Sequence, residues 1–168
     1  MAAKRFLRFV NNVLTEVFGV QASAGAANAG DIVALDDSGR IDNSMMPVGI
    51  GTDTASIQAS ENLAAGDWVN VWNNSGAKVR KADATTAGKE AHGFVLAAVT
   101  SGNPATVYFE GTNTQVSGQT PGAVFLQTTA GIGGATVPSA SGNVAQQIGV
   151  AVSATAVNFE RGTPVVLA

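Results

Sequence analysis

Residues 4–20, KRFLRFVNNVLTEVFGV, carry apolar and polar side chains with the spacing of an amphipathic helix. When successive residues are placed about 100° apart, every apolar residue falls on one half of the wheel and every other residue on the opposite half. The apolar half is wider than the seam between two helices requires. The pattern predicts an amphipathic helix over residues 1–20, with an apolar face made of Phe6, Leu7, Phe9, Val10, Val13, Leu14, Val17, Phe18 and Val20.

Such a helix has three possible uses: packing on its own domain, docking on another subunit, or lying on a membrane surface. The stretch that follows, QASAGAANAG (21–30), consists of small and polar residues and is typical of a flexible linker. As a coil it would span roughly 15–20 Å. Because a helix on such a tether can reach away from the rest of the chain, we favour docking on another subunit. The linker continues into an extended arm, and together they occupy residues 21–54.

From about residue 55 to residue 168, short β-branched runs alternate with turn sequences, as in all-β folds. GDWVNVWNNSGAKVRKADA (66–84) predicts a hairpin that turns at residues 73–76. A second turn is glycine-rich, in TTAGIGGATVP (128–138). We therefore expect a mainly β chain, with a single antiparallel β-barrel or β-sandwich body preceded by the N-terminal helix and the arm.

The body also repeats itself, since VYFEGT begins at residue 107 and VNFERGT at residue 157. Apolar runs open at Gly66 and Gly93 and again at Gly122 and Gly149, and both offsets are 56 residues (122 − 66 and 149 − 93). Equal offsets are typical of a duplicated supersecondary unit. The copies lie at about 63–113 and 119–165. Halves of about 50 residues hold little core alone, so we expect one continuous body.

The amino-acid composition argues against several classes of function. Charged residues are 12% of the 168-residue chain, about half the usual share, which favours a surface meant for contact with other subunits. The net charge of −3 argues against a general nucleic-acid binder. The chain has no cysteine, which excludes disulfides and thiolate ligands. It has no run of about 20 apolar residues, and polar residues interrupt residues 6–20 too often for a signal peptide.

The segment GDIVALDDSGRIDNSMMP (30–47) has a distinctive form, carried by Leu35-Asp36, Gly39-Arg40-Ile41-Asp42, Ser44 and Pro47. It resembles a segment of virion structural proteins of tailed bacteriophages, among them tail-fibre and capsid-decoration proteins, where it acts as an extended connecting arm. NFERGTPVVL (158–167) is similar to the closing strand of such proteins. The resemblance covers about two thirds of the chain. Its motifs are structural, so it implies a kind of assembly rather than an activity.

The resemblance implies a decoration, or cement, protein on the outer surface of a capsid. Its partners would be the major capsid protein and copies of itself, with a trimer favoured; nucleic acid, membranes and cofactors are not expected. The alternative within this class is a tail- or head-fibre component with a receptor-binding β-body. Partner contacts are expected from the helix and the arm, through Phe6, Phe9, Val10, Val13, Leu14, Val17, Phe18, Ile32, Leu35 and Ile41.

No arrangement of residues points to catalysis or to a metal, and we expect no enzyme. His92, the only histidine, stands before a predicted strand and has no nucleophile motif to serve. Asp36, Asp37 and Asp42 lie close together but lack the spacing of a calcium loop. Turn formation accounts for them, because Asp side chains bond to the backbone that follows them.

Two further groups of charged residues have structural explanations. Glu110 and Glu160 occupy equivalent places in the two copies, which favours a structural role over a pair of hydrolytic carboxylates. Lys78, Arg80 and Lys81 follow one strand and predict a solvated sheet edge rather than a nucleic-acid surface. A carbohydrate-binding or hydrolytic β-domain is the third functional alternative. It predicts a cleft lined by Trp68 or Trp72 with carboxylates nearby.

Overall fold

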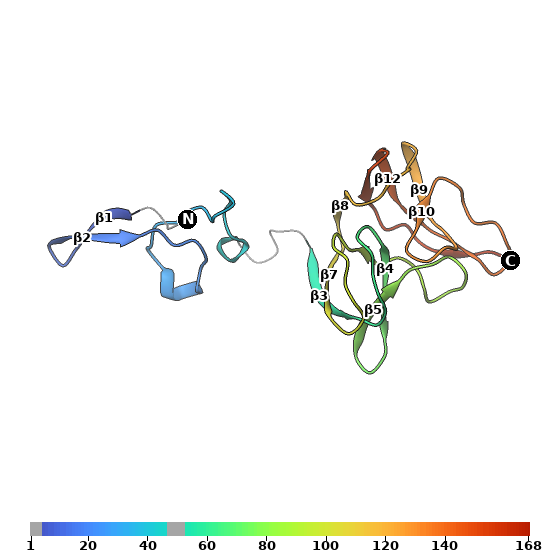
Figure 1. Ribbon diagram of the computed structural model, residues 1–168, viewed down its shortest axis with the longest axis horizontal. Coiled ribbons are helices and arrows are strands. Elements are labelled where there is room, and N and C mark those ends of the chain that lie inside the picture. The colour runs from blue at the N-terminus through green and yellow to red at the C-terminus, as the bar shows by residue number, and fades with distance from the viewer. Residues whose placement is uncertain (1–4, 47–52) are drawn as a thin grey trace. The chain divides into compact units, whose positions relative to one another are not determined.

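The computed structural model describes residues 5–46 and 53–168. Lys4 of the expected helix and Pro47 of the arm motif lie outside the described residues. The chain forms two compact units, Met1–Gly51 and Thr52–Ala168 (Figure 1). The only helical elements in the described ranges are two 3-10 turns, η1 (Gly25–Asn28) and η2 (Asn43–Met45). The prediction of a mainly β chain is confirmed.

The predicted N-terminal helix is wrong, because the same residues form a β-hairpin. β1 (Arg5–Val10) and β2 (Val13–Phe18) pair antiparallel along their whole length, with Phe9 opposite Leu14. Each strand is rich in valine and phenylalanine, which suit a strand better than a helix. Neighbouring apolar residues come in pairs along this segment, so the same spacing that fills one side of a helical wheel also fills both faces of a hairpin.

The hairpin depends on its two-residue turn. Asn11 and Asn12 have φ angles of 50° and 62°. A type I′ turn requires positive φ at both central residues, and asparagine tolerates this conformation better than most residues. The twist of this turn matches the right-handed twist of paired strands, so a short connection is enough.

After the hairpin the chain folds back on the same unit. Gly19 is buried, and a Cβ added there would lie 2.7 Å from the Cβ of Ala34. Val20 donates its N–H to the carbonyl of Ile32 at 2.8 Å and accepts from the N–H of Ala34 at 2.8 Å. Residues 21–30, which the sequence suggested as a flexible linker, therefore form a loop whose flanking residues, Val20 on one side and Ile32 and Ala34 on the other, are hydrogen-bonded to each other.

Five strands of the body close into a barrel in the order β3-β5-β4-β6-β7. All neighbouring strands are antiparallel except β3 and β5, whose parallel pairing completes the ring. β4 and β5 form the predicted hairpin, turning through Ser75 and Gly76 at positive φ. The barrel strands are β3 (Thr54–Ala59), β4 (Trp68–Asn73), β5 (Ala77–Lys81), β6 (Gly93–Phe94) and β7 (Pro104–Tyr108).

The second half of the body forms a five-stranded sheet beside the barrel, in the order β10-β9-β12-β13-β8 (Figure 1). These strands take the places of β5, β4, β6, β7 and β3 in the barrel. Within the described residues β8 and β10 do not pair, so this sheet stays open. Its strands are β8 (Gly111–Asn113), β9 (Gly122–Leu126), β10 (Gly133–Gly134), β12 (Gln147–Ser153) and β13 (Ala156–Phe159); β11 (Val144–Ala145) and β14 (Val165–Val166) form a separate pair.

The matching strand orders support the interpretation of a duplicated unit, and two glycines take equivalent places in it. A Cβ on Gly93 would lie 2.4 Å from the carbonyl oxygen of Tyr108 on the paired strand. A Cβ on Gly149 would lie 2.1 Å from the carbonyl oxygen of Asn158. Both copies thus need a glycine where one strand crosses its neighbour closely. A single barrel or sandwich that includes both copies stays a prediction.

Two apolar clusters hold the body together. One belongs to the barrel half alone and consists of Ala59, Leu63, Val69, Val79, Val95, Ala105 and Val107. The other combines both halves, because Trp68 and Phe94 of the barrel pack with Val124, Leu126 and Ile148 of the sheet. The ring of Trp68 lies 5.7 Å from that of Phe94, centre to centre. The halves therefore share a core.

A buried amide also joins the two halves. Gln146 is fully buried, and its side chain accepts from the N–H of Ala91 at 2.8 Å and donates to the carbonyl of Ala91 at 3.0 Å. Asn113, also fully buried, donates to the carbonyl of Gly66 at 2.9 Å. A buried amide without partners costs about 1–3 kcal/mol. These bonds therefore favour the observed packing of sheet on barrel over alternatives that would leave them unmade.

Candidate partner-binding surface

The register of the N-terminal hairpin places four large apolar side chains on one side. Opposed residues of an antiparallel pair point the same way, and so do residues two apart along a strand. Phe9 lies opposite Leu14, while Leu7 and Phe18 lie two and four places from them along their strands. We call Leu7, Phe9, Leu14 and Phe18 the hairpin face.

The hairpin face is open to solvent. Leu7 and Phe9 are 68% and 69% exposed, and Leu14 and Phe18 are 57% and 56% exposed. Single exposed apolar residues are ordinary, but a contiguous group of them marks an interaction site. The unit also has little interior of its own: among residues 5–9 and 11–46, Gly19 alone is buried. A two-stranded hairpin is marginally stable by itself, so this face is suited to packing against a partner.

The charges on the hairpin face neutralise each other. Arg5 and Glu16 are 2.8 Å apart, and the guanidinium of Arg5 lies 4.7 Å from the ring centre of Phe18. Both charged side chains are more than half exposed, so the pair contributes little to stability. Its consequence is that the face carries no net charge, which gives it no attraction for phosphate groups.

The opposite side of the hairpin is tied to the loop that follows. Arg8 donates to the carboxylate of Asp31 at 3.3 Å. Phe6 and Val17, which are opposed in the register, are half-buried on this side. On this side Phe6 and Val17 are thus partly covered by their own unit, whereas the hairpin face is free.

The arm motif folds around two aspartates. The carboxylate of Asp36 accepts from the N–H and the hydroxyl of Ser38 at 2.9 and 2.7 Å, and from the N–H of Arg40 at 2.9 Å. Asp42 caps η2 by accepting from the N–H and the hydroxyl of Ser44 at 2.9 and 2.6 Å. The Ser38 hydroxyl and then the Arg40 N–H lower the pKa of Asp36, and Ser44 lowers the pKa of Asp42. The turn chemistry predicted for these residues is present.

The structure places the expected partner-binding residues in three groups. Phe9, Leu14 and Phe18 belong to the hairpin face, whereas Phe6 and Val17 lie on the other side. Val13 is 61% exposed on that other side and is opposed to Val10 in the register. The arm residues are also exposed, with values of 42%, 55% and 52% for Ile32, Leu35 and Ile41.

Sequence reasoning missed three exposed apolar residues in this unit: Leu7, Val33 and Met46, the last two at 54% and 40% exposure. Leu7 belonged to the apolar side of the helical wheel but was not among the expected contacts. A reading of residues 5–18 as two strands around Asn-Asn would have put it beside Phe9. Val33 forms an isolated bridge with Val20, and Met46 follows a 3-10 turn, so neither lies in a longer element whose periodicity would identify the outward side chains.

His92 lies in the body and contacts the barrel backbone. The ring Nδ1 of His92 accepts from the backbone N–H of Val71 at 3.1 Å. The backbone N–H of His92 donates to the carbonyl of Val69 at 2.8 Å. Burial lowers the pKa of His92, and the positive charge of Arg161 lowers it further. The imidazole is thus a neutral acceptor within the fold.

The body has a hollow beside Trp68, but this hollow lacks the features that a carbohydrate-binding cleft requires. A hollow of about 220 Å³ is lined by Asp67, Trp68, Gln115 and neighbouring residues. Trp68 is 1% exposed, so its ring offers no open face for a sugar. Asp67 already accepts from the N–H of Ala64 at 2.7 Å and pairs with Lys81 at 3.2 Å. This hollow lacks the free carboxylate that hydrolysis would use.

The basic residues of β5 do not lie on a sheet edge, and that prediction is wrong. β5 has β4 on one side and β3 on the other, because the barrel closes there. The closure joins β3 to β5 by a short parallel pairing that leaves no local sequence signal. Arg80 lies over the ring of Trp72, 4.4 Å from its centre, and donates to the carbonyl of Gly88 at 2.7 Å.

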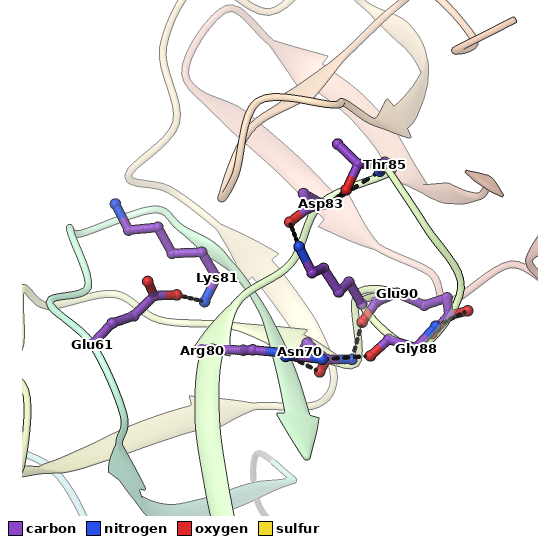
Figure 2. A network of polar contacts seen from close by, with 9 residues as sticks. Glu61, Asn70, Arg80, Lys81, Asp83, Thr85, Gly88 and Glu90 are labelled. Atoms are coloured by element: carbon purple, nitrogen blue, oxygen red, sulfur yellow. Dashed lines mark hydrogen bonds and ion pairs between the residues drawn. The ribbon is translucent and has the colours of Figure 1, made fainter. Parts of the chain in front are cut away.

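Figure 2 shows the polar contacts that hold the segment between β5 and β6. Asp83 accepts from the N–H of Thr85 at 3.0 Å, from its hydroxyl, and from the ammonium of Lys89 at 3.1 Å. Burial raises the pKa of Asp83, but the bonds from Thr85 and Lys89 outweigh it and leave that pKa lowered. Every group in this network has a partner within the fold, which identifies it as structural.

In residues 5–46 and 53–168, no three His, Cys, Asp or Glu side chains gather as metal ligands do. Within the same ranges, no helix has the length and apolar character needed to cross a bilayer. No protein-family model matches the chain, and no curated protein matches its sequence.

Proposed function

We propose that this chain is a structural, non-enzymatic virion protein of a tailed bacteriophage, a decoration protein that binds the outer capsid surface and stabilises the shell. The N-terminal unit is the anchor and the body is the part displayed. The observation that carries the proposal is the hairpin face, an exposed apolar surface on a unit with almost no interior, joined to a body with a complete core. The resemblance of residues 30–47 to phage virion proteins gives the partner: the major capsid protein.

The hairpin face is large enough to act as an anchor. Full burial of a large apolar side chain contributes about 1.5–3 kcal/mol. Covering four that are each more than half exposed would contribute about 5 kcal/mol before ordering costs. Exposed Ile32, Leu35 and Ile41 extend the apolar contact along the arm. A protein that binds only the assembled shell stabilises it by mass action.

The proposal also assigns a role to the repeated body. We take residues 52–168 to be one body made from a duplicated β-unit, which presents a surface and has no catalytic site. The shared cluster around Trp68 and Ile148 supports a single body. VYFEGT and VNFERGT then mark matching strands, β7 and β13, of the two copies.

A first test replaces two residues of the hairpin face by acids. The full-length double variant Phe9→Asp, Leu14→Asp is mixed with capsids that lack the protein, and binding is measured by co-sedimentation. Binding should fall by about a hundredfold or more, because two carboxylates would enter an apolar contact. Thr15→Asp is the matched control, since it adds a charge to the same hairpin on the other side and should bind almost normally. Unchanged binding of the double variant would contradict the anchor.

Copy number then separates decoration from the fibre alternative. The ratio of this protein to the major capsid protein is measured in purified particles by mass spectrometry. A ratio within a small factor of one per capsid subunit supports decoration. A ratio of a few per cent would favour a tail or head fibre, and absence from the particle would contradict both.

A further inference from the structure

The open sheet, residues 111–159, has no charged side chain, and we call these residues the uncharged half; Glu160 and Arg161 follow directly after them. Residues 111–159 contain no Asp, Glu, Lys, Arg or His. The barrel half, by contrast, carries acidic and basic groups on β5 and on the segment after it, such as Lys78, Asp83 and Lys89. Charged side chains keep surfaces soluble and separate, and interface centres are depleted of them. The uncharged half is therefore the part of the body best suited to contact.

One side of the open sheet packs on the barrel and the other side is exposed. Thr112, Asn158, Val150 and Ala123 form a continuous row across β8, β13, β12 and β9, each opposite the next. All four are exposed, as is Val152 at 55%. Their neighbours along the strands point the other way, and the buried ones are Asn113, Val124, Ala151 and Val157. We call the row of four, together with Val152, the outer face of the sheet.

In the first copy of the repeat, the row of residues that corresponds to this outer face is buried by packing. In the barrel, Trp68, Phe94 and Tyr108 form the matching row across β4, β6 and β7. That row is covered by the sheet, as the shared apolar cluster shows. The equivalent row of the second copy is left open. It is smaller and flatter, because Ala, Val, Asn and Thr replace aromatic rings.

We propose that the outer face of the sheet binds the uncharged half of a second copy of this chain. This goes beyond the capsid contact proposed above, because it concerns how copies bind one another. A charged partner surface would lose its hydration against this face and find no opposite charge in return. The uncharged half of a second copy brings no charged side chain into the contact, so no charge has to lose its hydration there. The acidic and basic groups of both barrel halves then stay hydrated, away from the contact.

The size of the molecule allows such a contact. A stable interface covers about 800 Å² on each partner. The accessible surface of the chain is 9653 Å², so less than a tenth of it is needed. The outer face offers apolar area for this purpose through Val150 and Val152, which are 38% and 55% exposed.

Sedimentation of the full-length chain tests the proposal. The wild type should be oligomeric at about 10–100 µM, and its dissociation constant should change less than about threefold between 50 and 500 mM NaCl, since no charge pairs cross the contact. Asn158→Lys and Val150→Lys should each raise the dissociation constant by about tenfold or more, because a lysine would lose its hydration there. Thr106→Lys, on an exposed position of β7, is the matched control and should sediment like the wild type.

Each other outcome contradicts the proposal. A monomeric wild type, or lysine variants that are folded by circular dichroism and sediment like the wild type, would overturn it. If Val150→Lys is unfolded, Asn158→Lys decides alone, because Asn158 is already polar and exposed. The anchor variant Phe9→Asp, Leu14→Asp should remain oligomeric while losing capsid binding. If that variant becomes monomeric, the copies meet through the hairpin instead, whatever the capsid experiment shows.

Discussion

At the scale of single residues, His92 is the group whose ionisation the fold opposes most clearly. Its Nδ1 must stay unprotonated to accept from the N–H of Val71. Burial, with Arg161 nearby, lowers its pKa below the usual 6.5. Ala91, the residue before His92, donates its backbone N–H to the buried side-chain amide of Gln146. Protonation of His92 would therefore weaken the fold close to the bond between the two halves of the body.

The pH dependence follows from the direction of this shift. The unfolded chain takes up a proton on His92 near pH 6.5, whereas the folded chain does so only at lower pH. Stability is thus complete above pH 6.5 and falls as the pH drops below it. We expect the free energy of unfolding to be lower at pH 5 than at pH 7.5, because the lowered pKa of His92 makes proton uptake favour the unfolded chain. Urea unfolding at pH 7.5 and pH 5 measures it.

His92→Asn is the control for this prediction, because its amide oxygen can accept from Val71 without titrating. The stability of this variant should differ less between the two pH values than that of the wild type. An equal loss in both proteins would assign the pH dependence to other groups. Asp83 is not expected to contribute here, since its lowered pKa keeps it ionised at pH 5.

At the scale of elements, the N-terminal hairpin shows where sequence patterns mislead. Residues 5–18 satisfy a helical wheel completely, yet they form strands. A helical wheel records only the spacing of apolar residues. It does not register the turn preference of Asn11 and Asn12, which lie in the middle of the segment. Two valine- and phenylalanine-rich runs of equal length around Asn11-Asn12 are the signal of a type I′ hairpin. By contrast, the turn at Ser75-Gly76 was predicted because glycine marks it openly.

The same comparison explains what was predicted correctly in the body. The β4–β5 hairpin depends on neighbouring residues, and its turn is visible in the sequence. The closure of the barrel depends on Gln58 and Ala59 pairing with Lys78 and Val79 in parallel. Nothing local specifies a parallel pair between strands that are not consecutive. For the candidate site, exposure of most expected residues was anticipated, but the division of the hairpin into two sides required the strand register.

The hairpin makes a sharp prediction about its turn. Asn12 has a φ of 62°, which a β-branched residue adopts at a cost of about 1–2 kcal/mol. Asn12→Val should therefore open the hairpin, because a two-stranded element has little stability to lose. Asn12→Gly should preserve or strengthen it. Cross-strand NMR contacts between Phe9 and Leu14 report the hairpin directly. Contacts between residues three apart in the wild type, as in a helix, would contradict the hairpin itself.

At the scale of the whole molecule, the two units differ in where their apolar side chains lie. Every buried apolar residue of the described chain lies at position 59 or later, so the body holds the core. The N-terminal unit instead exposes Leu7, Phe9, Leu14 and Phe18. Charge is divided as well, since residues 111–159 have none. The hairpin face is thus the surface that we propose for the capsid, and the outer face of the sheet is the one that we propose for a further copy.

This division predicts that the body folds without the anchor. A chain that begins at Thr52 keeps both apolar clusters and the bonds of Gln146 and Asn113. Its melting temperature should lie within about 3 °C of the full-length value, because both apolar clusters consist only of residues from position 59 onward. Differential scanning calorimetry measures it, and circular dichroism confirms the β-structure. The same fragment should stay oligomeric through the outer face while losing capsid binding. A fragment that unfolds would show that the N-terminal unit completes the core of the body, and the separation of anchor from display would then be wrong.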